Sequence, residues 1–250
     1  MLTTDRHALI LQTLKNQRTI TIHELVQITD ASESTIRRDL SQLEKDMRLK
    51  RVHGGASVIE RKMMEPSMSE KANTNTKQKN AIAKYAAELI EEGDCIYIDA
   101  GSTTIELYQY IKDKQIVVVT NGLLHIKYAV EAGMKAYMIG GQAKSVTGAM
   151  IGRGALISLE QYRFDKCFLG TNGIHFQSGF TTPDQEEAMV KEKALALSKE
   201  SYVLADESKF SEVYFAKIAP ISQATIITNK LDEEMLKKYK QYTDVKVVEV

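Results

Sequence analysis

The sequence predicts a two-domain protein of the α/β class, with an N-terminal winged helix-turn-helix over residues 1–57 and a mostly parallel α/β domain over residues 76–250. Two patterns lead to this prediction. The first 57 residues contain three helical segments and then a short basic hairpin, whereas apolar runs of strand length alternate with helical segments from about residue 77 onward. A chain of 250 residues is long enough to build two cores.

The N-terminal elements are indicated by their caps and by their apolar spacing. Thr21 and Glu24 form a capping box that opens a second helix. Ser32 is suited to cap a third helix, in which apolar side chains recur at helical spacing (Ile36, Leu40 and Leu43). Residues 49–56 alternate and end in paired glycines, which predicts a β-wing.

Residues 58–75 are predicted to be a linker because their periodicity is weak and they contain Pro66. The strands expected beyond it are CIYIDA, QIVVVT, KAYMIGG, FDKCFLG, SYVLAD, ATIIT and VKVVEV. Such continuous apolar strands, alternating with helices, are typical of a parallel sheet covered on both faces. Residues 179–188 are expected to form a loop running into a helix over 186–200, with a lid or a subunit contact as the functional alternative to simple helix capping.

Bulk properties restrict the function classes. Thirty-three basic and thirty-three acidic residues give a net charge of zero, so any basic surface must be local. Cys95 and Cys167 both lie in strand-like runs, which favours two buried, reduced thiols, and no cysteine and histidine cluster indicates a metal. The N-terminus lacks a signal-peptide pattern, and no apolar run is long enough to span a membrane. We therefore expect a cytoplasmic protein with no membrane contact, no metal and no cofactor.

The third helix carries polar and basic residues opposite its apolar face, near the N-terminal end that a recognition helix presents to base edges. The wing that follows is free of acids and suits phosphates. The candidate DNA contacts are Ser34, Thr35, Arg37, Arg38, Arg48, Lys50, Arg51 and His53. Residues 1–57 hold nine basic and seven acidic residues, so this weak excess also fits a protein-binding domain or a solvated charged face.

The α/β domain contains a strand, a glycine turn and a helix in the run IDAGSTTIEL. Backbone N–H groups at the start of such a helix, with nearby hydroxyls, favour an anion, and phosphate is the natural occupant; an ordinary capped turn is the alternative. Other strand exits are also small, polar and rich in glycine, and ligands bind at the carboxyl ends of strands in open α/β sheets. Candidate ligand contacts are Gly101, Ser102, Thr103, Thr104, Thr120, Asn121, Gly140, Gly141, Thr171, Asn172 and Lys209.

The run SESTIRRDLSQLEKDMRLKRVHGGA resembles the helix-turn-helix signature of the DeoR family of bacterial regulators. One position departs from the family, because Met47 stands where a glycine is usual and would be strained in a left-handed helix cap. The C-terminal half resembles the sensor domain of the same family, whose fold is similar to ribose-5-phosphate isomerase. The resemblance implies double-stranded operator DNA as one partner and a phosphorylated sugar as the other.

Carried onto this chain, the resemblance implies a phosphate loop at residues 101–104, with Thr120, Asn121, Gly140, Gly141 and Lys209 around it. It also implies Asp99, Thr171 and Asn172 as contacts of the sugar hydroxyls. The runs RFDKCFLGTNG and GFTTP are most similar to the fructose-operon repressor branch. That branch implies fructose 1-phosphate as inducer, with tagatose 6-phosphate as the nearest rival. For DNA binding, the hypothesis is a homo-oligomer, a dimer or tetramer, that places two recognition helices on repeated half-sites.

A sugar-phosphate isomerase with a fused DNA-binding head is the alternative from a different class. Such an enzyme needs a carboxylate base beside the sugar. The run LGTNG has Thr171 and Asn172 where the related isomerase carries acids, although Asp99 remains a candidate base. The sequence therefore favours a ligand-controlled repressor over an enzyme.

Overall fold

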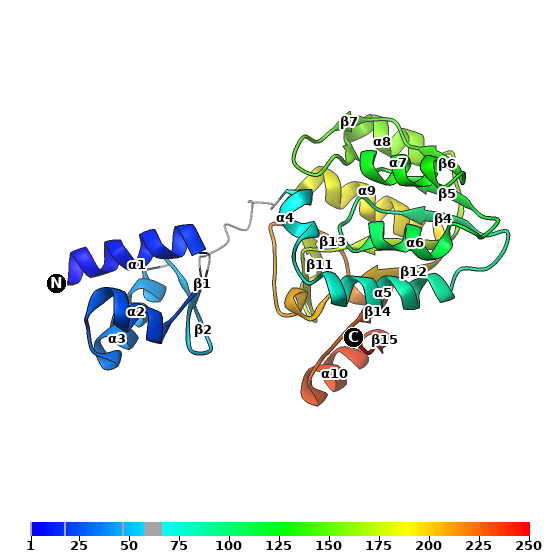
Figure 1. Cartoon of the computed structure of the whole chain (residues 1–250). Coiled ribbons are helices and arrows are strands. Elements are labelled where there is room, and N and C mark those ends of the chain that lie inside the picture. Colours follow the sequence, from blue (N-terminus) through cyan, green and yellow to red (C-terminus); the bar gives the residue numbers. More distant parts are fainter. Residues whose placement is uncertain (1, 18, 47, 58–66) are drawn as a thin grey trace. The chain divides into compact units, whose positions relative to one another are not determined.

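The computed structural model describes residues 2–17, 19–46, 48–57 and 67–250 (Figure 1). The chain divides into two units, residues 1–61 and 62–250, which are described separately. Met47 and the first half of the predicted linker, residues 58–66, lie outside the described residues.

The first unit is a winged helix-turn-helix, as predicted. Its helices are α1 (Thr3–Gln17), α2 (Ile22–Thr29) and α3 (Glu33–Lys45). Its strands are β1 (Thr19–Thr21), β2 (Lys50–Val52) and β3 (Gly55–Ser57). The strands pair antiparallel in the order β1-β3-β2, so the predicted wing hairpin gains a third strand from the turn between α1 and α2.

Both predicted caps of this unit are present. The Thr21 hydroxyl accepts the Glu24 N–H at 3.2 Å while the Glu24 carboxylate accepts the Thr21 N–H at 2.8 Å. Ser32 Oγ accepts the Thr35 N–H at 3.3 Å and opens α3. Each such cap stabilises a helix by about 1 kcal/mol. The apolar faces then close one small core (Ile10, Leu14, Leu25, Ile36, Leu40, Leu43 and Leu49).

The second unit is built on a seven-stranded parallel sheet in the order β15-β14-β12-β9-β4-β5-β6. The strands are β4 (Cys95–Ile98), β5 (Val117–Thr120), β6 (Lys135–Met138), β9 (Phe164–Gly170), β12 (Ser198–Leu204), β14 (Thr225–Thr228) and β15 (Val245–Val247). The helices are α4 (Met68–Ala72), α5 (Thr76–Glu88), α6 (Tyr108–Ile111), α7 (Leu123–Glu131), α8 (Gly152–Leu159), α9 (Gln185–Ala196) and α10 (Glu233–Lys240). Three 3₁₀ turns, η1 (Thr104–Leu107), η2 (Glu207–Lys209) and η3 (Ile221–Gln223), join them.

Two apolar cores lie on the two faces of this sheet. Alternate residues of β4 belong to different cores, because successive side chains of a strand point to opposite faces: Tyr97 packs in one core, and Ile96 and Ile98 pack in the other. Helices α8 and α9 cover the first face, and α5, α6 and α7 cover the second (Figure 1). The predicted parallel sheet with helices on both faces is confirmed.

Two predictions about residues 179–200 are wrong. The predicted loop contains β11 (Gly179–Thr182), which lies between β10 (Gly173–His175) and β13 (Ala216–Ala219) in a small antiparallel sheet. The following helix ends at Ala196, because Ser198 pairs with Phe164 and begins β12. Tertiary strand pairing thus overrides the local helical pattern at its C-terminal end.

Part of the predicted linker is ordered within the second unit, since residues 68–72 form α4 and Met68 is buried. The short hairpin of β7 (Gln142–Ala143) and β8 (Met150–Ile151) was also not predicted. Among the described residues, no helix is long and apolar enough to cross a membrane.

Candidate DNA interface and effector site

Helix α3 presents its predicted DNA contacts on the side opposite the core. Ile36 and Leu40 are fully buried, while Ser34, Arg37 and Arg38 are exposed and Thr35 is half-buried. Arg37 forms an ion pair with Glu33 at 2.6 Å, but both side chains are more than half exposed. Such a surface pair is worth little, so Arg37 can exchange this partner for a base or a phosphate.

The wing residues Arg48, Lys50, Arg51 and His53 are all exposed. Arg51 joins the wing to α3, since its guanidinium donates to Ser41 Oγ at 3.0 Å and its backbone N–H donates to the Glu44 carboxylate at 2.8 Å. The basic wing and the recognition helix therefore form a connected surface.

Sequence reasoning missed the residue that holds α3 in place. Asp39 lies on the apolar side of α3, buried, and accepts hydrogen bonds from the Arg6 guanidinium at 3.1 Å and from His7 Nε2 at 3.0 Å. Burial alone would raise the pKa of this carboxyl, but the bonds from Arg6 and His7 lower it. A charge three residues after Ile36 on an apolar face was the available signal.

In the second unit, the predicted ligand residues follow the carboxyl ends of five neighbouring strands, β12, β9, β4, β5 and β6. Adjacent strands lie about 4.8 Å apart, so this edge is roughly 19 Å wide. Lys209 follows β12 at one end, and Gly140 and Gly141 follow β6 at the other, where both glycines are exposed. A single sugar phosphate cannot contact both ends, so these residues cannot all belong to one phosphate site; the exit of β4 lies in the middle of the edge.

The loop after β4 contains unused hydrogen-bond donors. Ser102 and Thr103 are buried, yet their hydroxyls and backbone N–H groups have no partner within the described residues. Thr104 differs, because its hydroxyl donates to Asp99 O at 2.6 Å and accepts the Gly101 N–H at 3.1 Å, which fixes the turn. The helix expected here begins as the 3₁₀ turn η1, so the loop offers local N–H groups and little helix dipole.

Asp99 is not a free carboxylate. It is buried, it forms an ion pair with Lys191 of α9, and it accepts the Gly170 N–H at 3.1 Å. Lys191 also donates to Gly170 O at 3.2 Å. This pair joins α9 to the exits of β4 and β9. The sequence did not indicate Lys191, although a lysine at helical spacing from the buried Ala188 and Ala194 was a signal.

A strap of residues 142–151, which contains β7 and β8, covers the exit of β5. The Asn121 side chain accepts the Ala100 N–H at 2.8 Å and donates to Met150 O at 3.4 Å. The Thr120 hydroxyl accepts a backbone N–H at 3.1 Å, and both residues are buried. Asn121 thus supports the loop after β4, and Thr120 fixes the turn after β5.

Thr171 and Asn172 close the turn into β10. The Thr171 hydroxyl donates to the carbonyls of Gly173 and Thr181, each at 3.0 Å. Asn172 Oδ1 accepts the Thr182 hydroxyl at 3.0 Å. Both polar groups have partners within the hairpin.

The sequence also did not indicate Lys79 of α5. Its side chain is buried, its Nζ donates to the Lys71 carbonyl, and it takes part in none of the ion pairs found among the described residues. Burial lowers the pKa of Lys79 to about 8, and the charges of Asp206, Lys209 and Glu106 act on it. Glu106 belongs to η1, against which α5 packs, and Lys209 belongs to η2. A buried, undercompensated ammonium therefore lies between η1 and η2.

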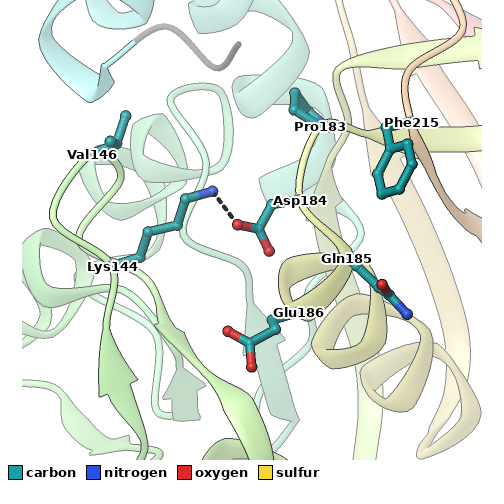
Figure 2. A pocket seen from close by; sticks show the side chains of 7 residues that line it. All are labelled: Lys144, Val146, Pro183, Asp184, Gln185, Glu186 and Phe215. Atoms are coloured by element: carbon teal, nitrogen blue, oxygen red, sulfur yellow. Dashed lines mark ion pairs between the residues drawn. The ribbon is translucent and has the colours of Figure 1, made fainter. Parts of the chain in front are cut away.

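The strap is pinned to the start of α9 on the other side. Lys144 pairs with Asp184 at 3.0 Å and with Glu187 at 3.1 Å, and Asp184 caps α9 through the Glu187 N–H, as predicted. Figure 2 shows Lys144 pointing at Asp184 across a pocket of about 390 Å³. None of the predicted ligand residues lines it.

The two units are a DNA-binding domain and a ligand-sensing domain, which is the domain organisation of a one-component transcriptional regulator. Residues 6–62 match the model of the DeoR-like helix-turn-helix domain, and residues 74–230 match that of the DeoR C-terminal sensor domain. The chain belongs to the DeoR family of DNA-binding transcriptional regulators.

Relatives of full length support the same assignment. The chain is 51% identical to the "uncharacterized HTH-type transcriptional regulator FruR" of Bacillus subtilis (strain 168), over 99% of each chain. It is 36% identical to the "lactose phosphotransferase system repressor" of Lactococcus lactis subsp. lactis, over 94% of this chain and 95% of that one. A ribose 5-phosphate isomerase A from Methanocaldococcus jannaschii is similar at 17% identity, with 55% of each chain covered and a TM-score of 0.42.

Proposed function

We propose that this protein represses a sugar-utilisation operon, of the fructose phosphotransferase type, and that fructose 1-phosphate releases it from its operator. The name of the Bacillus subtilis relative and the names of the lactose phosphotransferase repressors support a response to a phosphorylated sugar. Tagatose 6-phosphate is the nearest rival effector.

One observation carries the proposal: donors without an anionic partner lie on two segments that pack together, helix α5 and the loop that leads into η1. Ser102 and Thr103 offer hydroxyl and backbone N–H donors without partners in the described part of the chain, and the buried ammonium of Lys79 lacks a carboxylate. Neither hydroxyl oxygen is among the solvent-inaccessible polar atoms of the described residues that lack a partner, so an entering anion can reach both. A phosphate held between Ser102, Thr103 and Lys79, with Lys209 at its edge, would satisfy them with charge-assisted hydrogen bonds.

The other predicted ligand residues then have supporting roles. Gly101 and Thr104 give the phosphate loop its shape, Asn121 holds it from the β5 side, and Thr120 stabilises the turn that carries Asn121. The Asp99–Lys191 pair lies beside the loop, where it can meet sugar hydroxyls. Gly140 and Gly141 follow a strand two positions from β4, about 10 Å away, so we place them outside the phosphate contacts.

On the DNA side, we assign base contacts to Ser34, Thr35, Arg37 and Arg38, and phosphate contacts to the wing residues Arg48, Lys50, Arg51 and His53. A homo-oligomer would place two α3 helices in successive major grooves, about 34 Å apart. Repeated half-sites in the operator would follow from that symmetry.

The test is fluorescence anisotropy of the full chain on labelled DNA from upstream of its own operon. Fructose 1-phosphate is titrated first, then tagatose 6-phosphate, with fructose as the unphosphorylated control. Release by fructose 1-phosphate alone is the expected result. Tight DNA binding that no phosphorylated sugar changes would contradict the inducer proposal.

The isomerase alternative loses support at its predicted catalytic base. An isomerase base must be free to take a proton from the sugar. The one predicted candidate, Asp99, is buried and paired with Lys191. Incubating the full chain with ribose 5-phosphate and with fructose 1-phosphate, and following product by NMR, should show no turnover.

A further inference from the structure

Helix α4 is the first described element after residues 58–66, so the chain from the DNA-binding unit enters the second unit through it. The helix begins with a complete capping box, in which Ser67 and Glu70 bond each other's backbone N–H groups. Met68 is buried, and its N–H donates to Val146 O of the strap at 3.3 Å. The start of α4 is thereby docked on the strap.

The end of α4 is joined to the buried ammonium of the effector site. Lys79 Nζ donates to the backbone carbonyl of Lys71, in the last turn of α4. The same carbonyl accepts the N–H of Thr74 at 3.2 Å and the N–H of Asn73. Lys79 therefore belongs both to the proposed phosphate site and to the anchorage of the entering chain.

A second bond runs from the same turn to the other side of the site. Asn75, at a φ of 53°, does not cap α5 with its side chain; it donates instead to Asp206 Oδ1 at 3.0 Å. Asp206 caps η2, which contains Lys209. The turn between α4 and α5 thus contacts the segments that carry both lysines.

We propose that α4 is the switch element of this protein: a phosphate that binds Lys79 takes the ammonium away from the Lys71 carbonyl and loosens α4 from the sensor domain. The proposal rests on the proposed function, because it assigns Lys79 to the phosphate. It identifies the residues through which effector binding reaches the chain leading to the DNA-binding unit.

The direction follows from the relative strengths of the two bonds. A hydrogen bond between an ammonium and a phosphate is charge-assisted on both sides, whereas the Lys71 carbonyl is neutral. That carbonyl is not left unsatisfied when Lys79 leaves, because Asn73 and Thr74 still donate to it. An effector can shift the equilibrium only through such a difference in affinity between two states. The phosphate therefore binds more tightly to the state in which α4 is released, because Lys79 no longer donates to the Lys71 carbonyl in that state.

The test is hydrogen exchange of the full chain, measured by mass spectrometry on the segment 67–75, with and without saturating fructose 1-phosphate. We expect exchange in this segment to become about tenfold faster with the sugar phosphate, the size expected for losing one hydrogen bond to a charged group. Unchanged or slower exchange with the sugar phosphate bound would overturn the switch and leave the proposed function standing. If calorimetry detects no binding of any sugar phosphate, both proposals fail.

Matched lysine variants separate the switch from general charge effects. Lys79→Met should bind fructose 1-phosphate weakly, and its segment 67–75 should exchange fast even without ligand. Lys77→Met removes an exposed lysine two residues away and should behave as the wild type in both respects. Identical exchange of segment 67–75 in Lys79→Met and the wild type would contradict the role of the Lys71 carbonyl.

A reversible lock gives an independent measurement. The hydrogen bond from Met68 to Val146 brings their backbones together, so the pair Met68→Cys and Val146→Cys can be tested for a disulfide that holds α4 on the strap. The oxidised protein should still bind fructose 1-phosphate but keep its DNA, with operator affinity changing less than about twofold, and reduction should restore release. Full release from DNA by the oxidised, cross-linked protein would overturn the proposal.

Discussion

Replacing Asp39 by asparagine should destabilise the packing of α3 against α1 while keeping the shape of the side chain. The change removes the negative charge with which the Arg6 guanidinium, only 10% exposed, forms an ion pair. Removing one partner of a buried ion pair costs about 3–5 kcal/mol. Because Arg6 keeps some contact with water, we expect about 3 kcal/mol, which is roughly a hundredfold change in an opening equilibrium.

The assay is native-state hydrogen exchange of the full chain, since the chain has no tryptophan and the first unit has no tyrosine to report on its unfolding. Amides of α3 should lose about a hundredfold protection in Asp39→Asn, while strands β4 and β9 keep theirs. The matched control is Glu33→Gln, which breaks the exposed pair with Arg37 and should cost less than about 0.5 kcal/mol. Equal effects of the two substitutions would refute the reasoning.

The same pair predicts a pH dependence. Arg6 and His7 hold the pKa of Asp39 below its ordinary value against the opposing effect of burial. A carboxyl with a lowered folded pKa contributes stability that is fully present above its unfolded pKa, about 3.9, and is lost as the pH falls through the folded value. The difference in α3 protection between wild type and Asp39→Asn should therefore shrink below about pH 4. A constant difference down to pH 2 would contradict it.

Three further predictions concern function. Arg38→Ala should weaken specific operator binding by about 1–3 kcal/mol in anisotropy titrations and leave sugar-phosphate affinity unchanged; equal operator affinity would remove α3 from the interface. Ser102→Glu places a negative charge in the proposed anion site, so the protein should bind operator normally but resist release, whereas normal release would move the site elsewhere. Burial lowers the pKa of Lys79 to about 8, and since only the ammonium form attracts phosphate, calorimetry should show affinity for fructose 1-phosphate falling by up to about tenfold per pH unit above pH 8. A flat profile between pH 7 and 9 would show that Lys79 does not contact the phosphate.

Most of the secondary structure could be predicted from interactions between residues that are close in the sequence. The capping pairs at Thr21 and Ser32, the apolar spacing of α3 and the glycines of the wing each have a short-range cause, and each was predicted correctly. The parallel sheet was likewise evident, because strands buried on both faces carry continuous apolar runs. Predictions failed where a distant partner decided the outcome, as when pairing with β9 made Ser198 the start of a strand.

The sequence by itself determined the class of protein and the loop that offers donors to an anion, since both depend on residues that are neighbours in the chain. Only the tertiary structure decided which charges are available. It paired Asp99 with Lys191, 92 residues later, and left Lys79 buried without a carboxylate. It also joined Lys79 to the end of α4. The physical reason is that the availability of a charged side chain depends on its burial and on its ion-pair partners. Both depend on contacts between segments that are distant in the sequence, and a local sequence pattern does not predict those contacts.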